Sequence, residues 1–258
     1  MNNNLRNPLI QFLLLPALIG LFSCTVISTP SAPNLTPTLP LLSNNLTLTF
    51  TTISETSTSP VYTLTAQVPL LMGSNDPQVQ QFNRQSAALV QQEVDGFKQS
   101  LAGASNPPIA MGSFFDLKYS LFSPWSNFLS IKFDIDSYHD GAAHPFQYSR
   151  AFTLNLTTGH QVNLYQLFLP GTNSLQVLSD YCKNELAGRD IAFDASVTGA
   201  DPLADNYQTW NISAEGLVIT FDEYQVAAYA AGPQMVIIPY AALAGIIDPQ
   251  GPLAVFLP

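Results

Sequence analysis

Charged side chains are scarce in this chain: Asp, Glu, Lys and Arg make up 10% of its 258 residues. Lys and Arg together number 8 against 18 acidic residues, so the formal net charge is −10. A protein that binds nucleic acid needs a basic face for the phosphates, and so few basic residues do not form one. We therefore expect no nucleic-acid partner and expect a basic protein to be attracted instead.

Cysteine is almost absent, with one residue at Cys24 and one at Cys182. If Cys24 carries a lipid, the exported chain has no internal disulfide, and its hydrophobic core must hold it together. Cys182 lies in a predicted helix over residues 173–187, where Leu178, Cys182 and Leu186 recur at helical spacing. We interpret Cys182 as a small buried hydrophobic residue rather than a nucleophile, because a nucleophilic thiol requires a nearby histidine and an electropositive setting, and the local residues do not suggest either.

No apolar run reaches the roughly 20 residues that a membrane helix needs. The first residues instead resemble an export signal, with Arg6 ahead of an apolar segment over residues 9–22. The segment ends in Leu-Phe-Ser-Cys at residues 21–24, which resembles a bacterial lipobox, although Phe22 is larger than usual. The sequence thus predicts a lipoprotein signal peptide over residues 1–23 and lipidation of Cys24. Ordinary secretory cleavage beside a coincidental cysteine remains the alternative.

Residues 24–45 are rich in Pro, Ser, Thr and Asn and contain no charged residue. Such a composition cannot form a core, so it predicts a tether. Together these features predict an exported protein that a lipid anchors in the cell envelope, at the periplasmic face or the cell surface.

The rest of the chain alternates runs of strands with helices. Asp76-Pro77 is a strong helix start, and the apolar residues from Val79 to Leu101 can line one side of the helix that follows. Strands are expected over residues 46–53, 61–71, 114–122, 128–138, 148–156, 209–212, 217–221 and 235–238. This order predicts an α+β fold with helices packed on one side of a mainly antiparallel sheet.

Two segments carry a family likeness. Residues 132–168 contain Gly-Ala-Ala-His at 141–144, and residues 221–243 contain a Tyr-x-x-x-x-Tyr-Ala-x-Gly-Pro element at 224–233. Together they resemble DUF3298, a family of extracytoplasmic domains found in a lysozyme-sensing anti-sigma factor (RsiV). The resemblance implies a β-grasp-like C-terminal part over residues 126–258. Residues 46–125 resemble the DUF4163 region that often precedes it.

The resemblance implies a non-enzymatic binding module for a lysozyme-like protein or a peptidoglycan ligand. The alternative that it implies is an accessory or weakly catalytic protein of peptidoglycan or polysaccharide processing, because the family also accompanies deacetylase domains. The candidate ligand-binding residues lie in the two segments, and core packing is the competing interpretation of their aromatic members. They are Tyr138, His139, Asp140, Gly141, His144, Phe146, Tyr224 and Tyr229.

The same region offers side chains for two kinds of chemistry. His139, Asp140 and His144 offer metal-ligating side chains, but their spacing is not diagnostic and a third ligand would have to come from elsewhere. Asp134, Asp136 and Asp140 offer the carboxylates of a glycosidase, but solvated charges on the polar face of a strand explain two of them. The sequence has no HExxH, G-x-S-x-G or P-loop motif. We therefore predict no catalytic residue, no metal and no cofactor.

Overall fold

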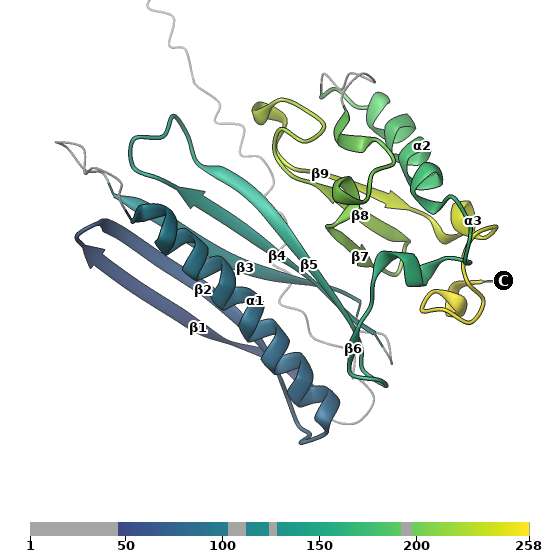
Figure 1. The fold of residues 1–258 in the computed structure, drawn as a ribbon, viewed down its shortest axis with the longest axis horizontal. Coiled ribbons are helices and arrows are strands. Elements are labelled where there is room, and N and C mark those ends of the chain that lie inside the picture. Colours follow the sequence, from purple (N-terminus) through teal and green to yellow (C-terminus); the bar gives the residue numbers. More distant parts are fainter. Residues whose placement is uncertain (1–45, 103–111, 124–127, 192–197, 258) are drawn as a thin grey trace, which may run out of the picture. The chain divides into compact units, whose positions relative to one another are not determined.

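The computed structural model describes residues 46–102, 112–123, 128–191 and 198–257, which form two β-sheets and several helices (Figure 1). The predicted signal peptide, Cys24 and the predicted tether lie outside these residues. Within the described part, no helix is long and apolar enough to cross a membrane. The elements are β1 (Thr47–Thr58), β2 (Val61–Met72), α1 (Pro77–Leu101), β3 (Ser113–Ser123), β4 (Phe128–Tyr138), β5 (Phe146–Asn155), β6 (His160–Gln161), α2 (Ser174–Ala187), β7 (Trp210–Ile212), β8 (Leu217–Phe221), β9 (Gln234–Ile238) and α3 (Tyr240–Leu243), with short 3-10 helices at Leu164–Leu167, Thr198–Ala200, Ala204–Tyr207, Tyr229–Ala231 and Ala254–Phe256.

The larger sheet contains six strands in the order β1-β2-β3-β4-β5-β6. Every neighbouring pair is antiparallel except β2 and β3, which are parallel. Parallel neighbours need a long crossover, and α1 provides it between these two strands. Figure 1 shows α1 lying across one face of the sheet.

The first hydrophobic core lies between α1 and this sheet. Val79, Phe82 and Phe97 of α1 are at most 5% exposed and belong to one cluster with strand residues such as Leu117 and Phe133. Apolar side chains in β4 alternate as expected, so Leu129, Ile131, Phe133 and Ile135 face this core while Lys132 and Asp134 face away. Burial of this alternating set fixes the register of β4 in the sheet.

A second core forms around the three-stranded sheet β7-β8-β9. The helix α2 packs against it through Leu178, Cys182 and Leu186, each of which is 0% exposed. The interpretation of Cys182 as a buried hydrophobic residue is therefore confirmed. All five residues of β8 are buried, as expected for a strand that is covered on both faces.

A buried polar cluster joins the two sheets. Ser130 Oγ of β4 lies 2.8 Å from Thr153 Oγ1 of β5. The same Oγ accepts hydrogen bonds from Asn211 Nδ2 at 2.9 Å and from the backbone amide of Ile212 at 3.1 Å, both in β7. The polar face of the larger sheet is thereby fixed to the edge of the smaller one.

The predicted α+β fold class is confirmed. The strand predicted over residues 128–138 matches β4, and the helix predicted over 173–187 matches α2 to within one residue. The first strand is longer than expected, because β1 continues to Thr58 and pairs with β2 along its whole length. The predicted boundary between residues 125 and 126 lies between β3 and β4, which are neighbours in the sheet.

Candidate functional site

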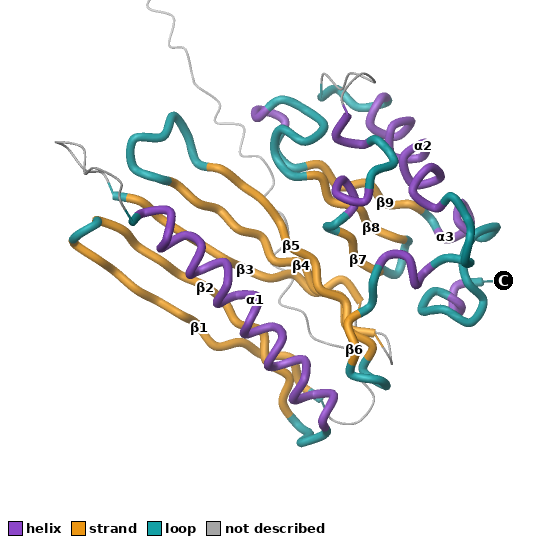
Figure 2. Tube along the Cα trace, viewed as in Figure 1, coloured by secondary structure: helices purple, strands orange, loops and turns teal. Residues whose placement is uncertain are grey.

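The loop that connects β4 to β5 carries half of the predicted site residues, and it extends beyond the sheet (Figure 2). The amide of Ala142 donates to the carbonyl of His139 at 2.9 Å and closes a turn. Gly141 has a φ of 91°, a conformation that residues with a side chain rarely adopt. Ala142, which replaces a glycine of the DUF3298 pattern, does not have a positive φ, so the turn accommodates the substitution.

His144 meets the two tyrosines of the second predicted segment. Its Nε2 lies 3.0 Å from Tyr224 Oη, and its ring centroid lies 3.8 Å from that of Tyr229. The Nδ1 atom lies 2.8 Å from the carbonyl oxygen of Pro145, which can only accept. The proton of a neutral His144 is therefore on Nδ1, and Tyr224 donates its hydroxyl proton to Nε2. The structure thus brings residues 80 positions apart into one aromatic cluster, here called the His144 cluster (His144, Tyr224 and Tyr229).

Two consecutive carboxylates hold the tyrosine segment against β5. Glu223 Oε2 accepts from the amide of Gln147 at 2.9 Å, and Asp222 Oδ1 accepts from the amide of Ser149 at 2.8 Å. Burial raises the pKa of Asp222 to about 6, although the Ser149 amide opposes the shift. Tyr224 follows directly with a φ of 65°, which is strained for a residue with a side chain. The flanking bonds hold that conformation and aim the ring at His144.

His139 lies at the other end of the loop and has different neighbours. Its Nε2 is 2.5 Å from Ser100 Oγ in the last turn of α1, and its ring centroid is 5.5 Å from that of Phe97. Ser100 Oγ also lies 2.6 Å from the carbonyl oxygen of Phe97. Because the hydroxyl has one proton, the imidazole and the carbonyl compete for it. A serine hydroxyl within hydrogen-bond distance of an imidazole is the basic unit of nucleophilic catalysis.

The remaining predicted residues do not join either group. The backbone amide of Asp140 donates to Ser113 Oγ at 2.9 Å, which ties the loop to the start of β3. Phe146 stacks on Tyr148 with the ring centroids 5.8 Å apart, and Tyr138 donates its hydroxyl to the carbonyl of Ala142. In the described part of the chain, no group of three His, Cys, Asp or Glu side chains is arranged to hold a metal ion.

Of the three carboxylates that the sequence offers for glycoside hydrolysis, Asp134 and Asp136 line one hollow, and Asp140 does not line it. Asp134 pairs with Lys132 at 2.7 Å, and Asp140 lies in the loop. Asp136 is directly opposite Asp116 on the neighbouring strand, a residue that the sequence did not single out. Burial and then the charge of Asp116 raise the pKa of Asp136. Together with Asp134, these two carboxylates line a hollow of about 280 Å³ on the polar face of the sheet.

Comparison with known proteins gives a family match over part of the C-terminal half. Residues 165–241 match the family described as "Protein of unknown function (DUF3298)". This segment belongs to DUF3298. The predicted resemblance is therefore confirmed there, and the match includes the segment with Tyr224 and Tyr229. The fold also resembles two DUF3298 crystal structures, from Bacteroides fragilis NCTC 9343 (TM-score 0.61, 13% identity, 83% of this chain and 97% of that chain) and from Pseudomonas aeruginosa PAO1 (TM-score 0.58, 15% identity, 81% and 97%). At this identity the likeness shows the fold alone.

A curated relative corrects one prediction. The chain is 31% identical over 106 residues to a protein named "Esterase Rv3036c" from Mycobacterium tuberculosis. The match covers 40% of this chain and 45% of the relative, so it spans less than half of that protein. The prediction that the protein is not an enzyme is contradicted, because part of this chain is similar to a protein named an esterase. Ser100 was missed because a serine in the last turn of a helix has no sequence signal.

Proposed function

We propose that this protein is an ester hydrolase in which Ser100 is the nucleophile and His139 is the general base. The observation that carries the proposal is the 2.5 Å distance between Ser100 Oγ and His139 Nε2. The similarity to a protein named an esterase supports the reaction class. Ser100 is exposed, so a substrate can reach its hydroxyl.

The reaction follows from this geometry. His139 Nε2 takes the hydroxyl proton while Oγ attacks the ester carbonyl, and the resulting imidazolium then protonates the departing alcohol. Water then attacks the acyl-serine, again with His139 as the base, and releases the acid. Competition from the Phe97 carbonyl for the Ser100 proton would make this a slower nucleophile than one held by a full triad.

The test is hydrolysis of p-nitrophenyl acetate and butyrate by the full chain, combined with labelling by a fluorophosphonate. Ser100→Ala should abolish labelling, and both Ser100→Ala and His139→Gln should lower kcat/KM by at least about a hundredfold. Matched controls are Ser120→Ala and His160→Gln, because both residues are exposed and lie away from this pair. Unchanged labelling of the Ser100→Ala variant would identify another nucleophile and refute the assignment.

A second candidate function rests on the His144 cluster. Tyr224 is 55% exposed although its ring is stacked on Tyr229 and bonded to His144. Exposed tyrosines held rigidly are suited to binding, because little side-chain entropy is lost on contact. Because this chain has a net charge of −10, a basic protein such as a lysozyme is a suitable partner. Peptidoglycan is the other candidate ligand.

Calorimetry with lysozyme and with purified peptidoglycan at two salt concentrations tests this binding function. Binding to lysozyme should weaken as salt increases, and Tyr224→Ala should weaken it by about tenfold. Phe50→Ala is the matched control, because Phe50 is an aromatic residue of β1 that is 46% exposed. If wild type and Tyr224→Ala bind a ligand, lysozyme or peptidoglycan, with equal affinity, the His144 cluster is excluded as the site for that ligand.

The proposed location is the cell envelope, with the lipid on Cys24 as the membrane anchor. The proposal is supported by the lipobox-like residues 21–24 and the uncharged segment after them. Expression in a bacterium that is fed a palmitate label should give a labelled protein in the membrane fraction. Cys24→Ala should lose the label, and retention of the label would show that Cys24 is not the acceptor.

A further inference from the structure

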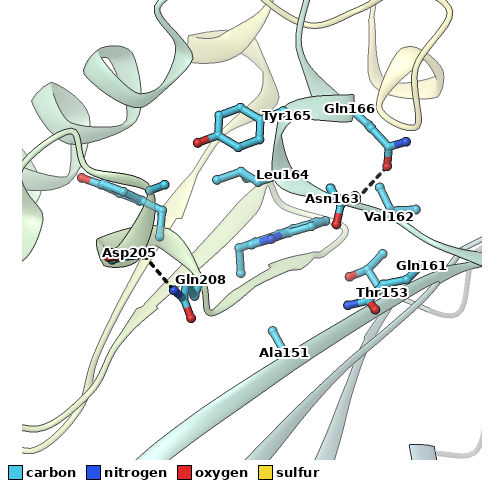
Figure 3. A pocket seen from close by; sticks show the side chains of 13 residues that line it. Ala151, Thr153, Gln161, Val162, Asn163, Leu164, Tyr165, Gln166, Asp205 and Gln208 are labelled. Atoms are coloured by element: carbon cyan, nitrogen blue, oxygen red, sulfur yellow. Dashed lines mark hydrogen bonds between the residues drawn. The ribbon is translucent and has the colours of Figure 1, made fainter. Parts of the chain in front are cut away.

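A hollow of about 560 Å³ lies between β5, the 3-10 helix Leu164–Leu167 and the segment before β7. Figure 3 shows Tyr165 and Leu164 on the side of this hollow opposite Ala151. Its volume is within the range of about 300–1,000 Å³ that is usual for small-molecule sites. Its lining includes neither Ser100 nor any residue of the His144 cluster, so it is a separate feature.

The floor of this hollow is apolar and its rim is polar. Val162, Leu164, Tyr207 and Trp210 line it and are each at most 8% exposed. The rim contains exposed side chains with amide or hydroxyl groups, which are Gln161, Asn163, Tyr165, Gln166 and Gln208. An apolar aromatic floor with a few polar groups around it is the usual composition of a ligand site.

The rim amides are positioned before any ligand arrives. Asn163 and Gln166 form a capping box, in which the Gln166 Oε1 accepts from the Asn163 amide at 2.8 Å. Both side chains keep their NH₂ groups as donors. Gln208 Nε2 donates to Asp205 Oδ1 at 3.1 Å, so the Gln208 carbonyl oxygen is turned outward as an acceptor. Fixed side chains lose little entropy on binding.

The charge of the lining restricts the ligand. Asp205 is the one Asp, Glu, Lys, Arg or His among the described residues that line the hollow. With no cation, the site does not favour an anion, and one exposed carboxylate is not enough to select a cation. Amides both donate and accept, as sugar hydroxyls do, and aromatic rings pack against the apolar faces of sugar rings. We propose that this hollow binds a neutral oligosaccharide.

Tyr165 indicates that the ligand is extended. It is 57% exposed, and together with Gln161, Val162 and Gln166 it also lines an adjoining hollow of about 590 Å³. The ring therefore stands between two hollows that share one wall. A linear chain of sugar units can occupy both hollows and pass over Tyr165, whereas a single sugar can occupy only one.

The experiment measures binding of two neutral probes, N-acetylchitotetraose and cellotetraose, to the full chain. The sequence has two tryptophans, so Trp125→Phe provides a background in which the emission reports Trp210 alone. Titration with at least one probe should change this emission in a saturable way. Tyr165→Ala should weaken the affinity by about tenfold and Gln161→Ala by a smaller factor, while the corresponding monosaccharide should bind more weakly than the tetrasaccharide.

Phe50→Ala is again the control and should leave the affinity unchanged, since Phe50 lies on β1. The proposal is overturned if neither probe binds, or if Tyr165→Ala and Gln161→Ala bind as tightly as wild type. Stronger binding of a neutral tetrapeptide than of either sugar would also overturn it. None of these outcomes depends on ester hydrolysis, so the experiment tests the oligosaccharide site independently of the proposed activity.

Discussion

The backbone amide of Gln147 donates to Oε2 of Glu223 across 2.9 Å, and this bond joins β5 to the segment that carries Tyr224. Glu223 is only 7% exposed, so its carboxylate depends on such bonds for the solvation it has lost. The short strand β6 pairs only with Leu154 and Asn155, which leaves the beginning of β5 as an edge. The carboxylates of Asp222 and Glu223 accept hydrogen bonds from backbone amides of that edge, as another strand would.

Replacing Glu223 by Ala should therefore loosen the His144 cluster. We expect the free energy of unfolding to fall by about 2 kcal/mol, because a charge-assisted bond to a buried amide is lost. Amide hydrogen exchange at Gln147 should become faster at the same time. Glu215→Ala, at an exposed glutamate, is the control and should change neither quantity. Unchanged exchange at Gln147 would mean that the Glu223 bond does not hold this edge.

Asp222 should make the stability depend on pH. Its pKa in the folded state is about 6, mainly because of burial, compared with about 4 in the unfolded chain. Between these values the folded state binds more protons than the unfolded state, so this residue's contribution to stability decreases as pH rises from about 4 to about 6. Above that window both states carry a carboxylate and the contribution is constant.

Asp222→Asn removes this titration while keeping an oxygen that can accept from Ser149. The free energy of unfolding of the variant, relative to that of wild type, should increase by about 1 to 2 kcal/mol between pH 4 and pH 7. This figure is reduced because Asp222 is partly exposed to solvent screening. Urea unfolding at several pH values gives the difference. Glu215→Gln controls for a general loss of one negative charge. A difference that is flat across the window would show that Asp222 titrates normally.

Ser130 should be critical for joining the two sheets. Its hydroxyl accepts from Asn211 and from Ile212, so its single proton goes to Thr153. Ser130→Ala leaves these buried groups without their partner and should cost about 3 kcal/mol in the free energy of unfolding. Ser120→Ala removes the same atom from an exposed position of β3 and should cost less than about 0.5 kcal/mol. Equal costs for the two variants would contradict this role.

Much of this fold follows from periodicity in the sequence. The alternation of Leu129, Ile131 and Phe133 predicts β4, and the spacing of Leu178, Cys182 and Leu186 predicts α2, because each pattern states which side must be buried. The parallel pairing of β2 with β3 is not predictable in this way, since alternation identifies a strand but not its neighbour.

The site was predictable to a similar extent. The two segments that were predicted to resemble DUF3298 contain His144 and Tyr224, and the structure shows that these residues meet. Ser100 lies 39 residues from His139 in sequence, and no local pattern connects them. Their contact depends on the length of α1, which places its last turn beside the loop after β4. Such distances are set by the packing of whole elements.

Cys182 should not be the nucleophile of the proposed ester hydrolysis. Burial raises the pKa of its thiol to about 12, well above the ordinary value of about 8.5. Only the thiolate is a nucleophile, so iodoacetamide at pH 8 should leave Cys182 unmodified in the native chain and modify it after denaturation, as peptide mapping by mass spectrometry would show. Cys182→Ala should keep the hydrolysis of p-nitrophenyl esters, because the reaction is assigned to Ser100. Rapid alkylation in the native state, together with loss of hydrolysis in Cys182→Ala, would instead identify Cys182 as the nucleophile.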